Sequence, residues 1–276
     1  MDKIVVNSPA KINLGLNIVG KRNDGFHNLE TIFYPLKLTD KIHFSKSEDF
    51  IFRTNNHSLS SEASNLIITA KDLLEDAANK KLICNIYLEK NIPIGAGLGG
   101  GSSNAAVTLK ALNKLFDIKL PNKKLLELAL TLGSDVPFFL NPVPSFATSR
   151  GEILNEIPLK LNGYLLLVNP GIHISTKWAF ENCIPKNNEI NVERIIKEVN
   201  LDEGFSDLLT NDFEEIVFAE YPEIKEVKEK IIEMGAYFSL MTGTGSSVYG
   251  IFNNKEKAET AKENFNRRYF TYIEKL

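Results

Sequence analysis

The sequence predicts an α+β protein in which most strands pair antiparallel. Alternating apolar residues over 11–18, a turn over 20–25 and a second apolar stretch over 29–38 are typical of a β-hairpin. The second half of the chain ends in the order strand, turn, strand, helix, strand. Helical periodicity occupies several segments between these strands, and there is no tandem repeat or low-complexity tract. Strands joined by turns as well as by helices indicate the α+β class.

Length and composition limit the possible classes of protein. At roughly 150 residues per domain, 276 residues correspond to one large domain or two modest ones. With 24% charged and 43% hydrophobic residues, the chain is globular and not disordered. The 32 Lys and Arg residues against 35 Asp and Glu give a net charge of −3, so no overall positive field is present to bind a nucleic-acid backbone. We therefore expect no nucleic-acid partner.

Cysteine usage and hydropathy predict a cytoplasmic protein. The two cysteines, Cys84 and Cys183, are too few for a disulfide framework and lack the paired spacing of a zinc site. The N-terminus has no signal-like apolar region. The longest apolar runs, such as 136–140 and 165–168, are far shorter than a bilayer span. We therefore expect no membrane partner.

The first half of the chain is expected to mix strands and helices. In the first strand, Ile12 and its alternate neighbours form an apolar face, and Lys11 and Asn13 lie on a polar one. Helical spacing follows over 65–78, then a strand over 82–88 that ends before Pro93. Two helices come next, one capped by Ser102 or Ser103 and one over 122–132.

A domain boundary is predicted between residues 158 and 159, giving domains 1–158 and 159–276. Residues 155–162 are loop-like and precede a strand over 164–168, which Asn169-Pro170-Gly171 ends. The remaining expected elements are helices near 175–183, 191–199, 207–219 and 223–234, two strands flanking 243–246, a helix over 255–267 and a final strand.

A glycine-rich loop carries the clearest chemical signal. Five of the 17 glycines occupy seven consecutive positions, 95–101, directly before a helix. Glycine lets backbone N–H groups approach an anion closely, and a helix N-terminus adds further donors and a positive dipole end. The alternative is a flexible turn before a helix. Phosphate is the natural ligand, and the candidate binding residues are Pro93, Ile94, Gly95, Ala96, Gly97, Leu98, Gly99, Gly100, Gly101, Ser102 and Ser103.

Other phosphate loops can be eliminated. A Walker A loop requires Lys followed by Ser or Thr after its last glycine, and Ser102-Ser103-Asn104 stands there instead. The G-x-G-x-x-G spacing of Gly95, Gly97 and Gly100 suits a dinucleotide fold only if a parallel strand follows the helix, and here a second helix follows. A protein kinase would need H-R-D and D-F-G motifs downstream, and neither occurs.

Three motifs in order resemble the GHMP kinases, a family that includes galactokinase, homoserine kinase and mevalonate kinase. They are Ser8-Pro-Ala-Lys-Ile-Asn-Leu14, the glycine loop, and Met241-Thr-Gly-Thr-Gly-Ser-Ser-Val-Tyr-Gly250. The resemblance spans almost the whole chain. It implies an N-terminal domain like ribosomal protein S5, a ferredoxin-like C-terminal domain and an active site between them.

Further strings narrow the resemblance to a branch that acts on a polyol linked to cytidine diphosphate. They are Asp24-Gly-Phe-His27, Gly97-Leu-Gly-Gly-Gly-Ser-Ser-Asn104 and Gly133-Ser-Asp-Val-Pro-Phe138. This branch implies ATP-dependent phosphorylation of the polyol 2-hydroxyl in non-mevalonate isoprenoid synthesis. Three departures stand out: Phe26 where Tyr is common, Ser149 where Gly is frequent, and Gly-Thr-Gly for Gly-Ser-Gly in the third motif.

The resemblance implies a catalytic role for two residues. Asp135 would be the base, and Lys11 would contact the reacting hydroxyl and keep the Asp135 carboxylate ionised, which suits a transfer dominated by positioning and charge stabilisation. On the residues alone, Asp135 can instead cap the turn at Pro137, and Lys11 can be a solvated edge-strand lysine.

The resemblance also implies the substrate site. A cytosine would be held between Phe26 and Phe180 and read by His27, and Asn13 would orient the substrate. Phe26 and Phe180 could instead fill their own domain cores. The loop of Thr242, Gly243, Thr244 and Gly245 would lie beside the diphosphate, although on sequence alone it is a tight hairpin.

The implied cofactors are ATP and Mg²⁺, with Ser103 as a weak candidate metal ligand, and the implied assembly is a monomer or weak homodimer. Three alternatives remain. A homoserine or mevalonate type kinase would have no reason to keep Asp24-Gly-Phe-His27. A non-catalytic nucleotide-binding protein on the same fold would be expected to lose Lys11 or Asp135. A dinucleotide oxidoreductase is the most distant alternative.

Overall fold

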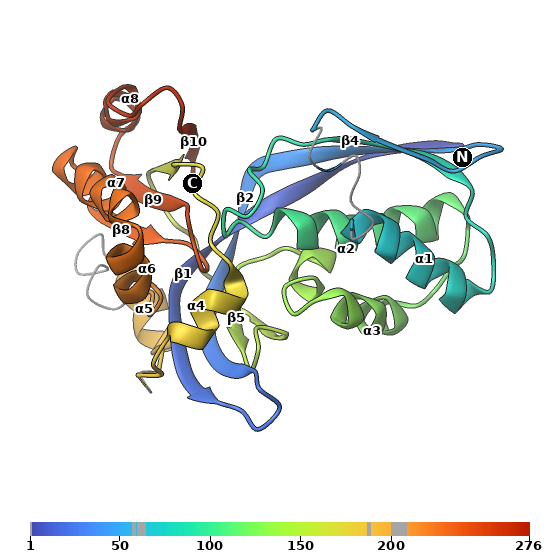
Figure 1. Ribbon diagram of the computed structural model, residues 1–276, viewed down its shortest axis with the longest axis horizontal. Helices are drawn as coiled ribbons and strands as arrows, with labels where there is room; N and C mark the ends of the chain where they lie inside the picture. Colours follow the sequence, from blue (N-terminus) through green and yellow to red (C-terminus); the bar gives the residue numbers. More distant parts are fainter. Residues whose placement is uncertain (1, 57–58, 60–64, 187–188, 200–208) are drawn as a thin grey trace. The chain divides into compact units, whose positions relative to one another are not determined.

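The computed structural model describes residues 2–56, 59, 65–186, 189–199 and 209–276 and contains two β-sheets with helices (Figure 1). Packing divides the chain into two compact units, each built from separate segments of sequence. Unit 1 comprises Met1–Lys11, Pro35–Ile94 and Gly99–Pro142, and unit 2 comprises Ile12–Tyr34, Gly95–Leu98 and Val143–Leu276. Strand pairing in the described residues is mostly antiparallel, with a parallel pair formed by β3 (Ile51–Thr54) and β4 (Cys84–Glu89), which confirms the predicted α+β class.

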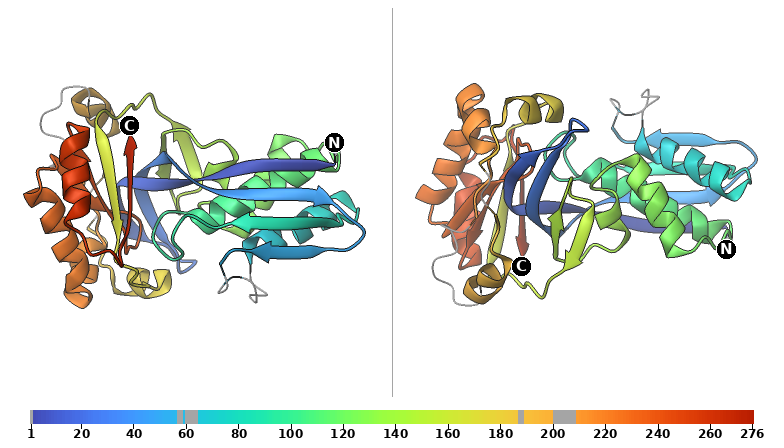
Figure 2. Two further views of the ribbon diagram at one scale, coloured as in Figure 1. Left: turned by 90° about the horizontal axis from the view of Figure 1, so that it is seen from above. Right: turned by 90° about the horizontal axis from the view of Figure 1, so that it is seen from below.

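Unit 1 is a sheet with helices on one face. Its strands are the beginning of β1 (Lys3–Lys21), the end of β2 (His27–Lys46), β3 (Ile51–Thr54) and β4 (Cys84–Glu89). Helices α1 (Leu66–Ala78), α2 (Gly100–Leu115) and α3 (Asn122–Leu132) lie together against that face in every view (Figures 1 and 2). The predicted ranges of α1 and α3 are confirmed, because their apolar residues recur at helical spacing and are buried.

Unit 2 contains a four-stranded antiparallel sheet in the order β10-β7-β9-β8. Its chain order, strand, helices, two strands, helix, strand, is that of a ferredoxin-like domain. Helices α6, α7 and α8 lie on one face of this sheet (Figure 2). The bounds are β7 (Tyr164–Asn169), α4 (Thr176–Asn182), α5 (Val192–Val199), α6 (Glu214–Glu220), α7 (Pro222–Glu233), β8 (Phe238–Met241), β9 (Val248–Phe252), α8 (Lys255–Glu263) and β10 (Phe270–Lys275).

Unit 2 also includes the hairpin formed by the end of β1 and the beginning of β2. Strand β5 (Ser145–Thr148) pairs with β2 and with β6 (Ile153–Glu156). The predicted hairpin is therefore confirmed, but its first strand is longer than expected, and neither face is exposed over 11–18. Lys11, Asn13 and Asn17 are buried. The strand therefore alternates between buried apolar side chains and buried polar side chains, which form hydrogen bonds.

Two helices are shorter than predicted. The helix expected over 207–219 begins at Glu214, because the Asn211 side chain accepts from Phe213 N and donates to the carbonyls of Met241 and Gly243 instead of joining a helical turn. Residues 207–208 lie outside the described residues. The helix expected over 255–267 ends at Glu263, where the Asn264 side chain donates to Thr260 O.

Candidate active site

Lys11 and Asp135 form an ion pair within unit 1. Lys11 Nζ lies 3.7 Å from Asp135 Oδ2, and the two side chains are 4% and 36% exposed. The alternative of a solvated edge-strand lysine is therefore wrong. Burial lowers the pKa of Lys11, and the negative charge of Asp135 partly opposes that change. The pair thus has one buried cation and one carboxylate that solvent reaches.

Asp135 lies in the short connection after α3. That helix ends at Leu132, as predicted, with Gly133 as its C-cap, and the 3₁₀ helix η2 (Pro137–Leu140) begins after Val136. No side chain makes a capping hydrogen bond at the start of η2. The alternative role of Asp135 as the cap of this turn is not observed, and its carboxylate faces Lys11 instead.

The glycine loop enters α2 through a left-handed residue. Gly99 has φ 69° and is the N-cap, so the helix begins at Gly100 and not after Ser102 or Ser103. The predicted serine cap is wrong, because Ser103 N already donates to Gly99 O and the Ser103 hydroxyl is bonded elsewhere. A methyl group on Gly99 would lie 2.7 Å from Phe139 Cζ and 3.2 Å from Lys11 Cγ. The loop therefore passes directly beside Lys11, and the first-turn N–H groups of α2 have no acceptor within the helix.

A buried polar network, which sequence reasoning missed, connects the segments before and after the glycine loop to Asp40. The fully buried Asp40 carboxylate accepts from Lys90 Nζ at 2.6 Å, from Asn91 N at 2.7 Å, from Ile92 N at 2.8 Å and from Asn104 Nδ2 at 3.0 Å. Burial lowers the pKa of Lys90, and Asp40 opposes that change. An acidic residue just after the apolar stretch over 29–38 was the available signal. Its partners lie fifty or more residues away, so the sequence could not pair them.

Ser103, the weak candidate for a metal ligand, is buried. Its hydroxyl accepts from Ser8 Oγ at 2.8 Å, and Ser8 Oγ in turn accepts from Asn104 Nδ2 at 2.9 Å. Within the described part of the chain, no group of three or more His, Cys, Asp or Glu residues could hold a metal ion.

In unit 2, the middle of the glycine loop contacts the second glycine cluster. A methyl group on Gly97 would overlap Thr242 O and lie 3.1 Å from Gly245 O, so only glycine permits this approach. Thr242 Oγ1 lies 3.4 Å from Gly97 O and accepts from Asn13 N at 2.9 Å. The segment over 242–247 joins β8 to β9 as a hairpin, as the sequence alone suggested, and it also lies against the glycine loop.

Three side chains fix the shape of this region. Asn13 is 1% exposed and donates from Nδ2 to Thr31 Oγ1 at 2.8 Å. Asn211, another residue missed by sequence reasoning, donates to Gly243 O at 2.8 Å. Thr244 is half-buried, with Oγ1 3.4 Å from Thr176 Oγ1. The predicted substrate-binding residues Asn13, Thr242 and Gly243 therefore belong to one hydrogen-bonded cluster in unit 2.

The predicted base-binding residues differ in exposure. Phe26 is 51% exposed, so the alternative that it fills the core is wrong. His27 is buried and stacks on Phe180 with ring centroids 5.4 Å apart. Phe180 also meets the edge of Phe213 at 4.9 Å and packs partly against the unit 2 core. Burial, together with the positive charge of Lys21, lowers the pKa of His27, which favours the neutral imidazole.

Other residues of the glycine loop differ in how much of the side chain is exposed. Ala96 and Leu98 are buried, whereas the Ile94 side chain is 48% exposed. His173 lies against the loop, since a methyl group on Gly95 would meet its Nδ1 at 2.7 Å.

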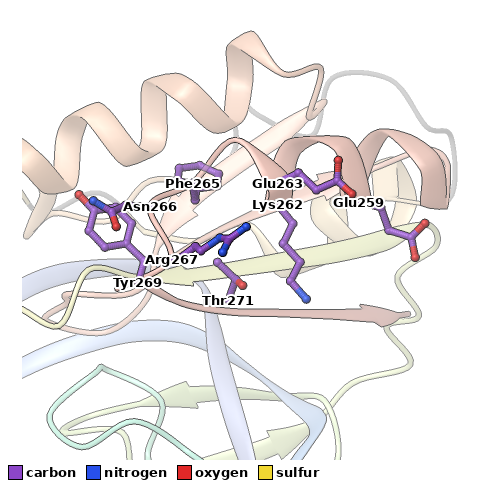
Figure 3. Close-up of a pocket in the computed structure, with 8 residues that line it drawn as sticks. All are labelled: Glu259, Lys262, Glu263, Phe265, Asn266, Arg267, Tyr269 and Thr271. Atoms are coloured by element: carbon purple, nitrogen blue, oxygen red, sulfur yellow. The ribbon is translucent and has the colours of Figure 1, made fainter.

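A cavity of about 920 Å³ lies elsewhere in unit 2, between α8 and β10 (Figure 3). It is lined by Lys262, Arg267, Thr271 and neighbouring residues, and by none of the predicted site residues. In the described parts of the chain, no helix has the length and apolar character needed to span a membrane.

Comparison with known proteins identifies the family. The GHMP kinases N terminal domain matches residues 65–141, and the GHMP kinases C terminal domain matches residues 195–271. The chain belongs to the GHMP kinases and is an ATP-dependent phosphotransferase, as the sequence motifs predicted.

Within that class, two similar relatives carry the same name. A 4-diphosphocytidyl-2-C-methyl-D-erythritol kinase of Chlorobium phaeobacteroides (strain BS1) is 40% identical, with 98% of this chain and 96% of the relative covered. The enzyme of the same name from Bacteroides thetaiotaomicron is 43% identical over 88% of this chain and 90% of the relative. The chain therefore belongs to the family of 4-diphosphocytidyl-2-C-methyl-D-erythritol kinases.

Solved structures agree with this placement. A crystal structure of 4-(cytidine 5'-diphospho)-2C-methyl-D-erythritol kinase has a TM-score of 0.85 and 32% identity, with 98% of both chains covered. A homoserine kinase from Cytophaga hutchinsonii has a TM-score of 0.75 and 18% identity over 100% of this chain and 95% of that chain, so it shares the fold alone.

Proposed function

We propose that this kinase transfers the γ-phosphoryl group of ATP to the 2-hydroxyl of 4-diphosphocytidyl-2-C-methyl-D-erythritol, a step of the non-mevalonate route to isoprenoids. The observation that carries the proposal is the pair formed by Lys11 and Asp135 beside the glycine-loop helix. A cation and a carboxylate next to a set of backbone N–H donors provide what phosphoryl transfer requires, namely positioning, charge stabilisation and a proton acceptor.

Asp135 acts as the general base in this scheme. Its carboxylate is exposed enough to reach an acceptor, and it takes the proton of the 2-hydroxyl while the oxygen forms a bond to the γ-phosphorus. The bond between that phosphorus and the oxygen of the β-phosphate breaks, and ADP leaves with the electron pair. The ammonium group of Lys11 pairs with the Asp135 carboxylate and stabilises the negative charge that develops on the acceptor oxygen.

The first turn of α2 holds the nucleotide phosphates in this scheme. Gly100, Gly101 and Ser102 present backbone N–H groups at a helix N-terminus, and their small side chains leave room for an anion. Mg²⁺ neutralises part of the triphosphate charge when it is bound. Ser103 stays a weak candidate ligand, because it would have to release its hydrogen bond with Ser8 to reach a metal.

Unit 2 supplies the acceptor site in this scheme. Phe26 offers an exposed ring for stacking on the cytosine, and His27 offers a polar edge near Phe180. The segment of Thr242, Gly243, Thr244 and Gly245 offers backbone groups to the diphosphate. Asn13 supports that segment through its bond to Thr242.

The test is a substrate panel. The purified chain is incubated with ATP and Mg²⁺ together with the cytidine substrate, its uridine analogue, the polyol phosphate without a base, homoserine or mevalonate, and ADP release is followed. We expect turnover with the cytidine substrate and markedly poorer turnover with the uridine analogue, because stacking accepts any base and discrimination requires hydrogen bonds to the ring edge. Equal efficiency with the base-free acceptor would reject the proposal.

A further inference from the structure

The loop that carries Phe26 and His27 is bonded to the turn between β5 and β6. Leu29 N donates to Ser149 O at 2.7 Å. The Arg22 guanidinium adds a second connection, since Nη1 donates to Ser149 Oγ at 3.0 Å and to Asn28 Oδ1 at 3.1 Å. Nε of the same group donates to Asp24, at 3.0 Å from Oδ2. One planar group therefore joins both ends of the loop to the neighbouring turn, which a lysine cannot do.

Ser149 occupies an unusual backbone conformation. Its φ is 62°, in the left-handed region that favours glycine. A serine there costs conformational energy relative to glycine, yet its hydroxyl makes two bonds that glycine cannot make. It accepts from Arg22 and donates to Glu152 Oε1 at 3.0 Å.

Arg150 connects this turn to the exposed aromatic ring. Its guanidinium carbon lies 4.7 Å from the centroid of the Phe26 ring, a cation–π geometry. Glu152 fixes the backbone of Arg150, because Arg150 N donates to Glu152 Oε2 at 2.7 Å. Half of Phe26 stays exposed, so Arg150 supports the ring without enclosing it.

We propose that Arg22, Ser149 and Arg150 are positioning residues that hold Phe26 in the orientation that stacks on a pyrimidine base. This inference rests on the proposed function, because it concerns the nucleoside end of the same acceptor. The three residues contact the loop and the ring, and they act on the substrate through Phe26. The set is called the Phe26 clamp below.

The Ser149→Gly variant separates positioning from stability. Glycine relieves the strain at φ 62° but removes both hydroxyl bonds, so a purely structural role predicts a change in Tm with unchanged kinetics. The clamp instead predicts that KM for the cytidine substrate rises roughly two- to fivefold, the range expected for a partly exposed polar contact, while KM for ATP stays the same. Asn79→Gly is the matched control, since Asn79 has φ 46° at the end of α1 and belongs to unit 1.

A double-mutant cycle tests whether the effect passes through Phe26. Ser149→Gly, Arg22→Lys and Arg150→Gln are each measured alone and with Phe26→Ala. We expect each rise in KM to disappear in the Phe26→Ala background. A rise that persists there, a KM for ATP that rises equally, or an unchanged KM in all three single variants would overturn the clamp. If the unaltered protein does not phosphorylate the cytidine substrate, the proposed function fails instead.

Discussion

At the scale of single residues, Lys11 and Asp135 differ in burial. The ammonium group is almost wholly enclosed, whereas about a third of the carboxylate side chain is exposed. A buried charge without its partner is costly, so Asp135 helps keep Lys11 protonated. The exposed side of Asp135 is then free to meet an acceptor hydroxyl.

Asp135→Asn and Lys11→Ala are each expected to lower kcat on the order of a hundredfold or more, with a smaller change in substrate KM, because their interactions strengthen in the transition state. Steady-state kinetics provide the measurement. Lys41→Ala, which removes an exposed lysine of unit 1, is the control that should behave like the unaltered protein. Near-normal turnover in a folded Asp135→Asn protein would return that residue to a structural role.

The lowered pKa of Lys11 predicts a pH dependence. If the ammonium form is required, activity must fall as pH rises through a value below the ordinary 10.5. The stability of the folded protein changes in the opposite sense and rises with pH between the folded and unfolded pKa values of Lys11. A buried protonated lysine is disfavoured in the folded state, and this cost decreases over that range. A pH profile of kcat should show the alkaline limb, and Lys11→Arg should shift that limb upward. A limb at the same pH in both proteins would assign it to another group.

The aromatic residues of the acceptor site should respond differently to truncation. Phe26→Ala removes an exposed ring, so we expect binding of the cytidine substrate to weaken by about 1–3 kcal/mol with little change in Tm. Phe180→Ala removes a ring that packs on Phe213 and the unit 2 core, so it should also destabilise the fold by about 2 kcal/mol or more. Substrate KM and thermal melts of both variants distinguish these outcomes. Equal loss of Tm in both would contradict the difference in burial.

At the scale of elements, the glycine loop shows which of its positions can report on the nucleotide. Gly99→Val would strain a residue at φ 69° and collide with Phe139, so a loss of activity there would reflect the protein itself. Gly101 can accept a methyl group without overlap, since that group would lie 3.6 Å from Leu66 Cδ1, an ordinary contact distance. It therefore offers the cleaner substitution.

We expect Gly101→Val to raise the KM for ATP, because the new side chain blocks the backbone N–H groups of the first turn. The rise should be equivalent to about 1.5–3 kcal/mol, which is the loss of one hydrogen bond to a charged group. Tm should change little. Gly20→Val is the matched control, since a methyl group on Gly20 would meet no heavy atom within 4 Å. Unchanged ATP kinetics in Gly101→Val would reject nucleotide binding at this turn.

Elements with strong periodicity could be predicted from sequence, and those set by distant partners could not. Helix α3 was predicted over its full range because its apolar residues repeat at helical spacing. The start of α2 was placed too late, because Ser103 is bonded to Ser8 and a left-handed glycine begins the helix. The predicted start of α6 is too early, because Asn211 bonds to the carbonyls of Met241 and Gly243, which are 30 and 32 residues away. Local spacing carries no information about such partners.

The candidate site shows the same limit. Its motifs marked Lys11, Asp135 and the glycine loop, because those residues are local strings with distinctive spacing. Their roles remain proposals. The supporting bonds of Asp40, Asn211 and Ser149 depend on tertiary contacts, so the sequence did not reveal them.

At the scale of the whole molecule, the two compact units are interleaved in sequence. Unit 2 takes residues from 12–34 and 95–98 as well as from the C-terminal half. Its hydrophobic core includes Leu16, Ile18 and Leu29 from the β1–β2 hairpin, all of them buried. Asp212 Oδ2 accepts from Ile18 N at 2.7 Å, which fixes the same hairpin to the segment before α6.

The predicted boundary at 158/159 can therefore be tested by cutting the chain there. A fragment of residues 159–276 keeps the four-stranded sheet but loses three large core side chains, each worth about 2–5 kcal/mol by analogy with truncation to alanine. Their sum is comparable to the about 5–15 kcal/mol that stabilises a typical folded protein. We expect the isolated fragment to melt without a sharp transition and to regain one when residues 1–158 are added, as followed by circular dichroism. A sharp transition in the fragment alone would mean that residues 159–276 fold independently, and the boundary would then mark an autonomous domain.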